Sequence, residues 1–454
     1  MLTPEIHAER RRSLTKTVKS PILLMGNGHR PRNLPMSPVP FRQDSNFLYF
    51  TGCTTPGAAV LMVDEQSTLY LTPPAEDDAL WHGITKTIEQ AAAALGFARV
   101  RPINDLEKDA RAIDDIATLA VPDLAQTQRA AAITGTSLAY GTKNGHDGLI
   151  DAVISMRRIM SAAELDQMRE TAVVTERAHR AAMAVTAPGV HERVIASTFQ
   201  DVVNRAGLTL AYSSIVTIRG EVLHNFEYVN TAEDGHLLLL DGGAEAASGY
   251  ATDVTRTWPV SGQFSARQRA AYAAVLEAQL TSIDMVRSGT RYKDVHMQTA
   301  RVIARFLADE GLLTCSPDAA IESGAQALFF PHGVGHLLGL DVHDMENFGD
   351  RASYPPNRTR SPQFGTGYLR LDLDLEPNMV VTIEPGFYVV PAILTDPTLR
   401  ERFSNQVNFD KAMSWIGFGG IRIEDDVVVT SGDPEVLTET IPKSIDDVES
   451  AVGG

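Results

Sequence analysis

Cysteine is scarce in this 454-residue chain, which has only Cys53 and Cys315, far apart in the sequence. Two cysteines exclude a disulfide framework and a zinc site built on thiolates. Long apolar runs are also missing, because stretches such as "HLLLLDG" are far shorter than the ~20 residues that span a bilayer. The N-terminal "MLTPEIHAERRRSL" lacks the apolar core of a signal peptide. We therefore expect a cytoplasmic protein with no membrane partner.

Basic residues are too few to balance the acidic ones, at 40 against 57, so the net charge is −17. This deficit argues against nucleic acid as a partner, because bulk electrostatics would repel it. Apolar content of 44% and charged content of 21% are typical of a globular protein with a large core. At roughly 150 residues per domain, the length predicts two or three domains.

The first part of the chain alternates between strand-like and helix-like segments. We expect a helix at "TIEQAAAALGF", and strands at "SPILLMGNG", "NFLYFTGC", "AAVLMVDE", "STLYLTPP" and "LAYGT". This alternation predicts an α/β layer domain.

In the second part of the chain, pairs of longer helix-like segments alternate with strand-like segments. A capping-box pattern, Ser161 with Glu164, predicts a long amphipathic helix to about Val185. Further helices are expected at "HERVIASTFQDVVNRAG", "SARQRAAYAAVLEAQLTSIDMV" and "YKDVHMQTARVIARFLADEG". Strands follow each helix pair, which suggests an internally duplicated α+β domain. Residues 345–367 and 391–415 show no clear period, and we expect long surface loops there.

Four acidic residues end or interrupt apolar strands of this second part: Asp241, Asp253, Glu384 and Glu424. Each one alone is explained by a strand end that faces water. As a set they need a common compensation, because a buried carboxylate is costly unless it is paired or binds a cation. Four carboxylates neutralise two divalent ions, and oxygen donors with one imidazole suit Mn²⁺, Co²⁺, Fe²⁺ or Zn²⁺. Two such ions ~3.5–4 Å apart would hold a hydroxide and polarise a carbonyl, which is chemistry suited to amide hydrolysis.

Histidines cluster in "FFPHGVGHLLGLDVHD", which contains three of the twelve: His332, His336 and His343. This is not the "HExxH" helix of zinc proteases, because no glutamate follows His332 and the interleaved glycines disfavour a helix. We expect a strand or turn here. His224 in "VLHNFEY" joins the same pool. An amide hydrolase also needs oxyanion donors and a proton route to the leaving nitrogen, so only some of these imidazoles need bind metal.

These motifs resemble those of the proline-specific metallopeptidases, aminopeptidase P and prolidase, which share the pita-bread fold. "HGVGHLLGLDVHD" fits the family signature, and the ligand order recurs in "DGG", "TDVTRT", "HGVGH", "TIEPG" and "IRIEDD". The resemblance covers about residues 160–440. It implies an α+β chain with a pita-bread catalytic domain at 159–454, after a creatinase-like α/β domain at 1–158. It also implies two metal ions, bridged by Asp253 and Glu424 and held by Asp241, Asp253, His336, Glu384 and Glu424.

The resemblance assigns further roles. It implies that His224 and His343 stabilise the tetrahedral intermediate and assist proton transfer, while Arg422 pairs with acidic groups of the site. His332 and Tyr388 resemble substrate-contacting residues near the metals. In the first domain, Arg157 in "SMRRIMS" resembles an arginine that recognises the proline end, and Trp81 in "ALWHGI" a tryptophan that lines a neighbouring subunit's site. A homodimer or homotetramer is therefore expected.

The leading hypothesis is an Xaa-Pro aminopeptidase that cleaves peptides with proline at the second position. A hydroxide bridging two ions, Mn²⁺ first among the candidates, would attack the carbonyl before proline, and Glu384 would carry the proton. An Xaa-Pro dipeptidase (prolidase) is the alternative, because the long spacing from Glu384 to Glu424 resembles prolidases. A metal-free scaffold that binds a peptide or partner is the alternative of a different class. The presence of all five ligand residues disfavours it. Organophosphate hydrolysis, a side activity of some relatives, cannot be read from the sequence.

Overall fold

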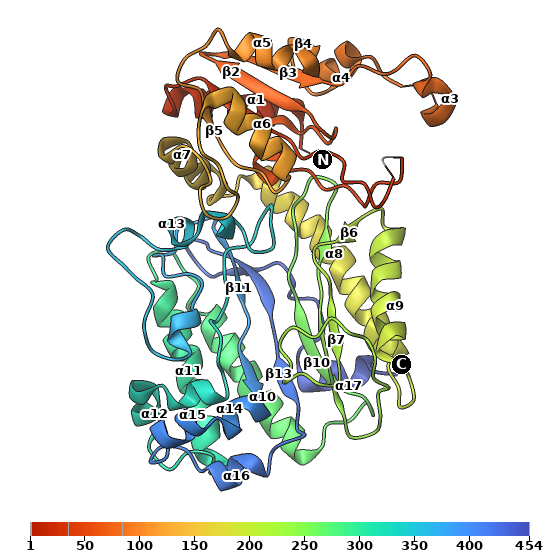
Figure 1. Cartoon of the computed structure of the whole chain (residues 1–454). Coiled ribbons are helices and arrows are strands. Elements are labelled where there is room, and N and C mark those ends of the chain that lie inside the picture. Colours follow the sequence, from red (N-terminus) through yellow and green to blue (C-terminus); the bar gives the residue numbers. More distant parts are fainter. Residues whose placement is uncertain (1, 35, 84, 454) are drawn as a thin grey trace. The chain divides into compact units, whose positions relative to one another are not determined.

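The computed structural model describes residues 2–34, 36–83 and 85–453. The chain forms two compact units, one made of Met1–Arg158 with Met345–Ala352 and the other of Ile159–Asp344 with Ser353–Gly454. In Figure 1 the first unit is mostly red to orange and the second runs from yellow to blue. In the described part of the chain, no helix combines the length and apolarity needed to cross a membrane.

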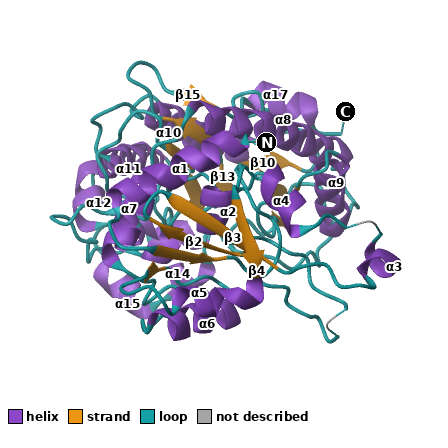
Figure 2. Ribbon diagram, turned by 90° about the horizontal axis from the view of Figure 1, so that it is seen from above, coloured by secondary structure: helices purple, strands orange, loops and turns teal. Residues whose placement is uncertain are grey.

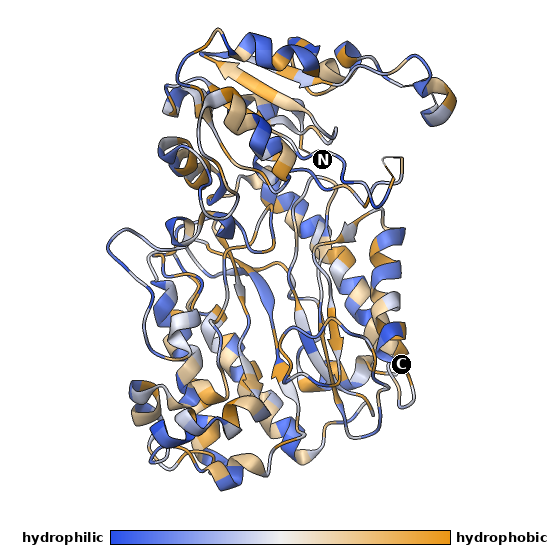
Figure 3. Ribbon diagram, viewed as in Figure 1, coloured by the Kyte–Doolittle hydropathy of each residue, from blue (hydrophilic) through white to orange (hydrophobic). Residues whose placement is uncertain are grey.

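A five-stranded sheet of order β4-β3-β2-β1-β5 forms the centre of the first unit (Figure 2). Its strands are β1 Ile22–Met25, β2 Ala59–Val63, β3 Gln66–Leu71, β4 Arg99–Pro102 and β5 Ala117–Thr118. The three middle strands β1, β2 and β3 pair antiparallel, and both edge strands pair parallel. Apolar residues run along β2 (Figure 3), four of its five residues are buried, and the sheet shares a core with Leu106 and Ala130.

The helices of the first unit are α1 Pro4–Thr17, α2 Ser45–Thr51, α3 Asp78–His82, α4 Ile88–Ala94, α5 Leu106–Ala110, α6 Leu124–Thr134 and α7 Asp147–Arg157. The strand expected at "NFLYFTGC" is wrong, because these residues form α2. The Asp44 side chain accepts from Phe47 N at its start, and Gly52 ends it in the left-handed region at φ 64°. All seven residues of α2 are buried, so no amphipathic period marked it as a helix. The strand expected at "LAYGT" is also wrong, with one isolated bridge at Ala139.

Two helix pairs, each followed by strands, build the second unit (Figure 1). The first half contains α8 Ala162–Val185 and α9 Glu192–Arg205, then β7 Ile215–Thr217, β8 Leu237–Asp241 and β10 Thr255–Pro259 in one antiparallel sheet. The second half contains α10 Ala266–Ile283 and α11 Tyr292–Asp309, then β11 Val380–Ile383 and β14 Asp425–Val428. All four expected helices are present, and the Glu164 carboxylate accepts from Ser161 N at 2.7 Å, as the capping box predicts.

The two halves repeat each other in burial. Across residues 171–190 and 271–290, buried, half-buried and exposed positions follow the same order at all twenty places. Glu192 and Tyr292 are the first residues of α9 and α11, so they occupy corresponding places. The internal duplication is therefore visible in the packing although the letters do not repeat.

Short elements complete the second unit: β6 Thr209–Leu210, β9 Ala244–Glu245, β12 Gly386–Tyr388, β13 Gly420–Arg422, β15 Glu435–Val436, α12 Pro317–Ser323, α14 Pro391–Thr395, α15 Pro397–Arg402, α16 Phe409–Met413 and α17 Ile445–Ala451. The expectation of a surface loop at 391–415 is wrong. Three short helices occupy it, and Leu394, Phe403 and Trp415 join the main core. Helices of five or six residues are too short to show a period. Residues 345–367 contain one four-residue helix, α13 Asp350–Ser353, and short 3₁₀ turns.

Candidate metal centre

Two aspartates meet at the end of the first-half sheet. Asp241 is the last residue of β8 and lies opposite Thr255 of β10. Asp253 was expected inside a strand, but it lies two residues before β10. The Tyr212 hydroxyl lies 2.5 Å from Oδ1 of both aspartates. A phenol has one hydrogen and donates it to one carboxylate at a time. The Tyr212 hydroxyl therefore does not offset the negative charge of the two aspartates.

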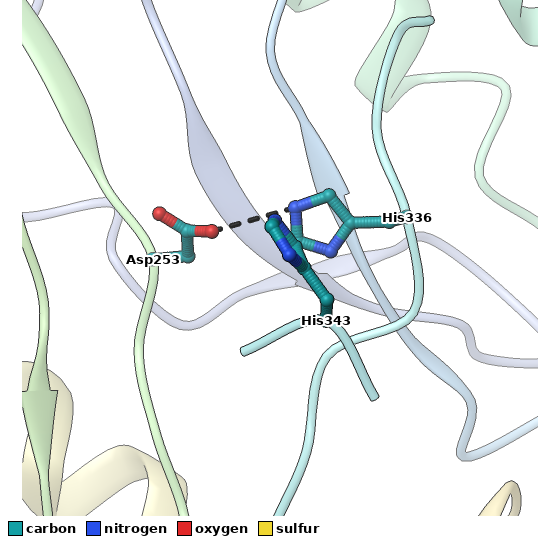
Figure 4. Close-up of side chains that lie close together, drawn as sticks. All are labelled: Asp253, His336 and His343. Atoms are coloured by element: carbon teal, nitrogen blue, oxygen red, sulfur yellow. Dashed lines mark ion pairs between the residues drawn. The ribbon is translucent and has the colours of Figure 1, made fainter. Parts of the chain in front are cut away.

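The second half supplies His336 from the irregular stretch 331–340, as expected for a turn rather than a helix. Its Nε2 lies 3.4 Å from Asp253 Oδ2 and 3.9 Å from Glu384 Oε1. The His336 backbone N donates to Thr382 Oγ1 at 3.2 Å, which ties the stretch to β11. Figure 4 shows Asp253 facing His336, with the His343 ring beside it; the two rings are perpendicular, with centroids 4.5 Å apart.

Two glutamates lie in short gaps between strands. Glu384 falls between β11 and β12, and Glu424 between β13 and β14. The Glu424 backbone N donates to Thr255 O at 3.0 Å, and its Oε2 accepts from Thr255 Oγ1 at 2.7 Å. Each half therefore delivers carboxylates to the same place, and backbone hydrogen bonds between the halves set their spacing.

All five expected ligands come together with His343. Their ligand atoms form three overlapping groups, each within 4.8 Å: Asp241, Asp253 and Glu424; His336, Glu384 and Glu424; and Asp253, His336 and His343. Burial raises the pKa of Glu384 to about 8, and burial with the neighbouring carboxylates raises the pKa of Glu424 well above its ordinary value. Burial also raises the pKa values of Asp241 and Asp253. Crowded acids of this kind fit a cation, which removes the penalty of ionising them together.

Arg422 is buried on β13 and binds the carboxylate cluster directly. Its Nη2 donates to Asp241 Oδ2 at 2.6 Å, its Nη1 to Tyr388 Oη at 3.0 Å, and its Nε to Thr255 Oγ1 at 2.9 Å. The charge of Arg370 also acts on Asp253 and Glu384, so two guanidinium groups stand against four carboxylates and the charge is not balanced. The donor set of oxygens with one or two imidazoles matches what Mn²⁺, Co²⁺, Fe²⁺ or Zn²⁺ accept.

Three further histidines surround the carboxylates or were predicted to do so. His332 Nε2 lies 2.9 Å from Tyr388 Oη, and its Nδ1 lies 3.7 Å from Glu384 Oε2. Burial first, and then Arg422, lowers the pKa of His332 to about 3; desolvation and His336 lower the pKa of His343 to about 3. His224 lies on an exposed loop, stacked on Phe226 with centroids 6.3 Å apart. Desolvation and Arg422 also lower the pKa of His224, so the surroundings of all three imidazoles favour the neutral form.

Sequence reasoning missed Arg370 and Tyr212. The half-buried Arg370 lies near enough for its positive charge to lower the pKa values of His224, His332 and His343. A signal for it existed in "LRLDLDL", where the leucines Leu369, Leu371, Leu373 and Leu375 are buried and Arg370 alternates with them. Tyr212 in "LAYSS" had no such signal, because its role depends on the turn that brings it to the aspartates.

A buried charge network lies directly behind Glu424. Arg256 donates to Glu424 O at 2.6 Å and to Asp425 Oδ1 at 2.7 Å, and both side chains are fully buried. Lys443 and Gln279 also donate to the Asp425 carboxylate. This network fixes the start of β14 and the residue before it, Glu424.

Trp81 and Arg157 belong to the first unit. Trp81 on α3 is 63% exposed, and its Nε1 donates to Asp77 Oδ2 at 3.3 Å. Arg157 ends α7, is buried, and donates to Asn46 Oδ1 at 2.7 Å. Their expected contacts with substrate or with a neighbouring subunit therefore stay predictions.

Two models of known protein families match this chain. The family model of metallopeptidase family M24 matches residues 166–431, more than half of the chain. The chain belongs to metallopeptidase family M24. A second model, the aminopeptidase P N-terminal domain, matches residues 7–117, so the chain has the two-domain architecture of aminopeptidase P. The predicted family and fold class are confirmed.

Relatives within M24 carry two different names. The chain is 38% identical over 322 residues to a Xanthomonas campestris Xaa-Pro dipeptidase, covering 70% of this chain and 71% of the relative. It is 31% identical to a probable Xaa-Pro aminopeptidase of Verticillium alfalfae, covering 92% and 88%. The solved structure of Pseudomonas aeruginosa aminopeptidase PepP superposes with a TM-score of 0.83 at 29% identity, covering 99% and 98%.

Proposed function

We propose that this M24 chain is an Xaa-Pro aminopeptidase that hydrolyses the bond between an N-terminal residue and proline. The observation that carries the proposal is the convergence of five ligands from both halves, beside neutral histidines, in a chain with aminopeptidase P architecture. Proline makes the bond a tertiary amide with a fixed φ. A pocket shaped for that ring would give the specificity.

We infer two divalent ions, with Mn²⁺ as the first candidate and Co²⁺, Fe²⁺ or Zn²⁺ as alternatives. The ligand groups support two positions, because the group of Asp241 and Asp253 and the group of His336 and Glu384 share Glu424. When bound, such ions lower the pKa of a coordinated water and polarise the scissile carbonyl. Asp253 and Glu424 would bridge the two positions.

The chain's own groups supply the proton transfers. Glu384 would take the proton that the attacking water loses and give it to the proline nitrogen as that nitrogen leaves. His224 and His343 are neutral, and each keeps one N–H that can donate to the developing oxyanion. His332 and Tyr388, joined by a 2.9 Å hydrogen bond, form a polar wall for the substrate. Arg422 orients Asp241.

We also propose that the enzyme works as a homodimer or homotetramer in the cytoplasm. The exposed indole of Trp81 supports a role at another subunit's site, and two free thiols suit a reducing compartment. We expect Arg157 to contact the proline end of the peptide.

Xaa-Pro dipeptidase activity is the second candidate, and Arg370 favours it. A dipeptide carries a carboxylate directly after proline, and the charge of Arg370 reaches the three histidines around the site. Such a carboxylate would gain a cationic partner there, whereas a longer peptide would present a neutral amide.

The test compares a Xaa-Pro dipeptide with the matching Xaa-Pro-Xaa tripeptide, using the full chain loaded with Mn²⁺. A Xaa-Ala tripeptide is the control for proline specificity. Preference for the tripeptide supports the aminopeptidase, and dipeptide-only turnover would transfer the proposal to the dipeptidase. If the dipeptide is the substrate, Arg370→Met should raise KM for the dipeptide and leave KM for the tripeptide unchanged. Hydrolysis of neither proline peptide would refute both candidates.

A further inference from the structure

The loop 218–230 carries His224 without regular structure of its own. It leaves β7 at Ile218 and returns at Asn230, ahead of β8. The loop exposes apolar side chains to solvent at Val222, Phe226 and Val229. Ile218 and Tyr228 pack against the main core near the two ends, and the Tyr228 hydroxyl donates to Ser214 O at 2.5 Å. The order of the exposed middle of the loop therefore depends on how its ends are held.

One buried carboxylate holds both ends. Glu192, the first residue of α9, is fully buried. Its Oε1 accepts from Ile218 N at 2.9 Å, and its Oε2 accepts from Asn230 N at 2.9 Å. Asn230 Nδ2 lies 3.0 Å from each oxygen, and the Glu192 backbone N donates to Asn230 O at 3.0 Å. Residues twelve apart in sequence are thus joined by a single side chain.

We propose that Glu192 is a positioning residue for the reaction, because it closes the neck of loop 218–230 and so fixes the position of His224. The inference rests on the proposed function for the role of His224. A carboxylate is suited to the task, because its two oxygens accept from several N–H donors at once and charge-assisted hydrogen bonds are strong. A glutamine would turn one acceptor into a donor that faces another donor.

Further contacts inside the neck reinforce the same geometry. Thr217 Oγ1 accepts from Arg219 N at 2.9 Å and from Asn225 Nδ2 at 3.0 Å, which bends the loop next to His224. Gly220 and Gly420 cross at close range, since a Cβ on Gly220 would lie 2.6 Å from Gly420 O. This crossing brings the loop against β13, the strand of Arg422.

The internal duplication provides an independent parallel. Tyr292 is the first residue of α11, as Glu192 is of α9, and it too is fully buried. Its hydroxyl donates to Thr382 O at 2.6 Å, and Thr382 N donates in turn to His336 O at 3.0 Å. In both halves, the first residue of the second helix therefore holds a segment that carries a site histidine.

The experiment uses the full chain with Mn²⁺ and compares Glu192→Gln with Asp294→Asn, a matched loss of charge at an exposed place in the first turn of α11. Hydrogen exchange of peptides within 219–229 reports the loop without reference to activity. We expect exchange there to accelerate at least about tenfold in Glu192→Gln, from the loss of a charge-assisted hydrogen bond. It should stay unchanged in Asp294→Asn and in peptides of α8.

Kinetics separate positioning from general damage. Glu192→Gln should lower kcat roughly tenfold or more with a smaller change in KM, and the same substitution in a His224→Ala background should change kcat less than about twofold. An equal loss in both backgrounds, or unchanged loop exchange, would overturn the proposal. If Glu192→Gln does not fold, Asn230→Ala, which removes only the side-chain bonds, must show the same pattern or the proposal fails. A wild type inert toward Xaa-Pro peptides would instead refute the proposed function, which the exchange data do not test.

Discussion

His179 gives a prediction whose size can be worked out from the structure. It lies on α8, is fully buried, packs edge-on against Phe199, and its Nε2 lies 3.2 Å from Gly242 O. Burial lowers the pKa of His179 from 6.5 to about 3, and Arg256 adds to this effect. Between those two values, the unfolded chain binds a proton that the folded chain does not. The contribution of the neutral His179 to the free energy of unfolding is therefore fully present above pH 6.5 and is lost as the pH falls toward 3.

The magnitude follows from linkage. At pH 5 the unfolded histidine with a pKa of 6.5 is mostly protonated, which favours unfolding by about 2 kcal/mol relative to pH 7.5. His179→Gln removes this contribution, because glutamine does not titrate and its amide can still donate to Gly242 O. The variant should lose about 2 kcal/mol less than the wild type between pH 7.5 and pH 5.

The assay is urea unfolding of both proteins at the two pH values in excess chelator, followed by tryptophan fluorescence. Trp258 and Trp415 are buried in the second unit, whereas Trp81 is exposed, so the emission change reports that unit. The acidic cluster titrates equally in both proteins and cancels in the difference. The exposed His29→Gln is the control and should behave as the wild type. Equal losses of stability in wild type and His179→Gln would refute the assignment of a buried neutral imidazole.

Three other outcomes are expected. Glu384→Gln should lower kcat by at least about 10²-fold while circular dichroism stays unchanged, and retained turnover would rule out the proton shuttle. Removing divalent metal with a chelator should abolish turnover and lower the Tm, and adding Mn²⁺ should restore both. Metal at about 100 times its Kd should add ~2.7 kcal/mol to the free energy of unfolding. A Tm that does not respond to metal would contradict the site. Asp425→Asn should lower the free energy of unfolding by about 3–5 kcal/mol because it leaves Arg256 buried without its carboxylate, and a urea midpoint near the wild type would show that the network is dispensable.

The long helices and the clustering of the candidate ligand residues could be predicted from the sequence for physical reasons. Helices α8 to α11 are long enough to show a period, and Ser161 with Glu164 marks the start of one. Carboxylates in apolar strand sequences are unusual because burying them is costly. Asp241, Glu384 and Glu424 therefore predict a bound cation that they share. The family, the fold class and the metallopeptidase character inferred from these motifs are confirmed by the comparisons.

The elements and site residues that could not be predicted from the sequence depend on tertiary contacts. Helix α2 is buried on every side and so shows no amphipathic period, and strand propensity therefore predicted the wrong element. Asp44 and Gly52 cap the helix in the structure. The helices at 391–413 begin at prolines or after Asn408 and are too short for periodicity to detect. Tyr212, Arg370 and Glu192 act through partners tens of residues away, which no local pattern encodes. The roles assigned to the site residues stay predictions until the variants are measured.

The proposed ligands are divided between two duplicated halves, so the order in which the chain is synthesised matters for the site. Asp241 and Asp253 emerge from the ribosome long before Glu384 and Glu424. The backbone bond from Glu424 N to Thr255 O joins the halves only after the last ligand strand has formed. A nascent chain that has made only its first half thus holds two acids and no completed cage. On the proposed ligand set, peptide cleavage therefore requires nearly the whole polypeptide.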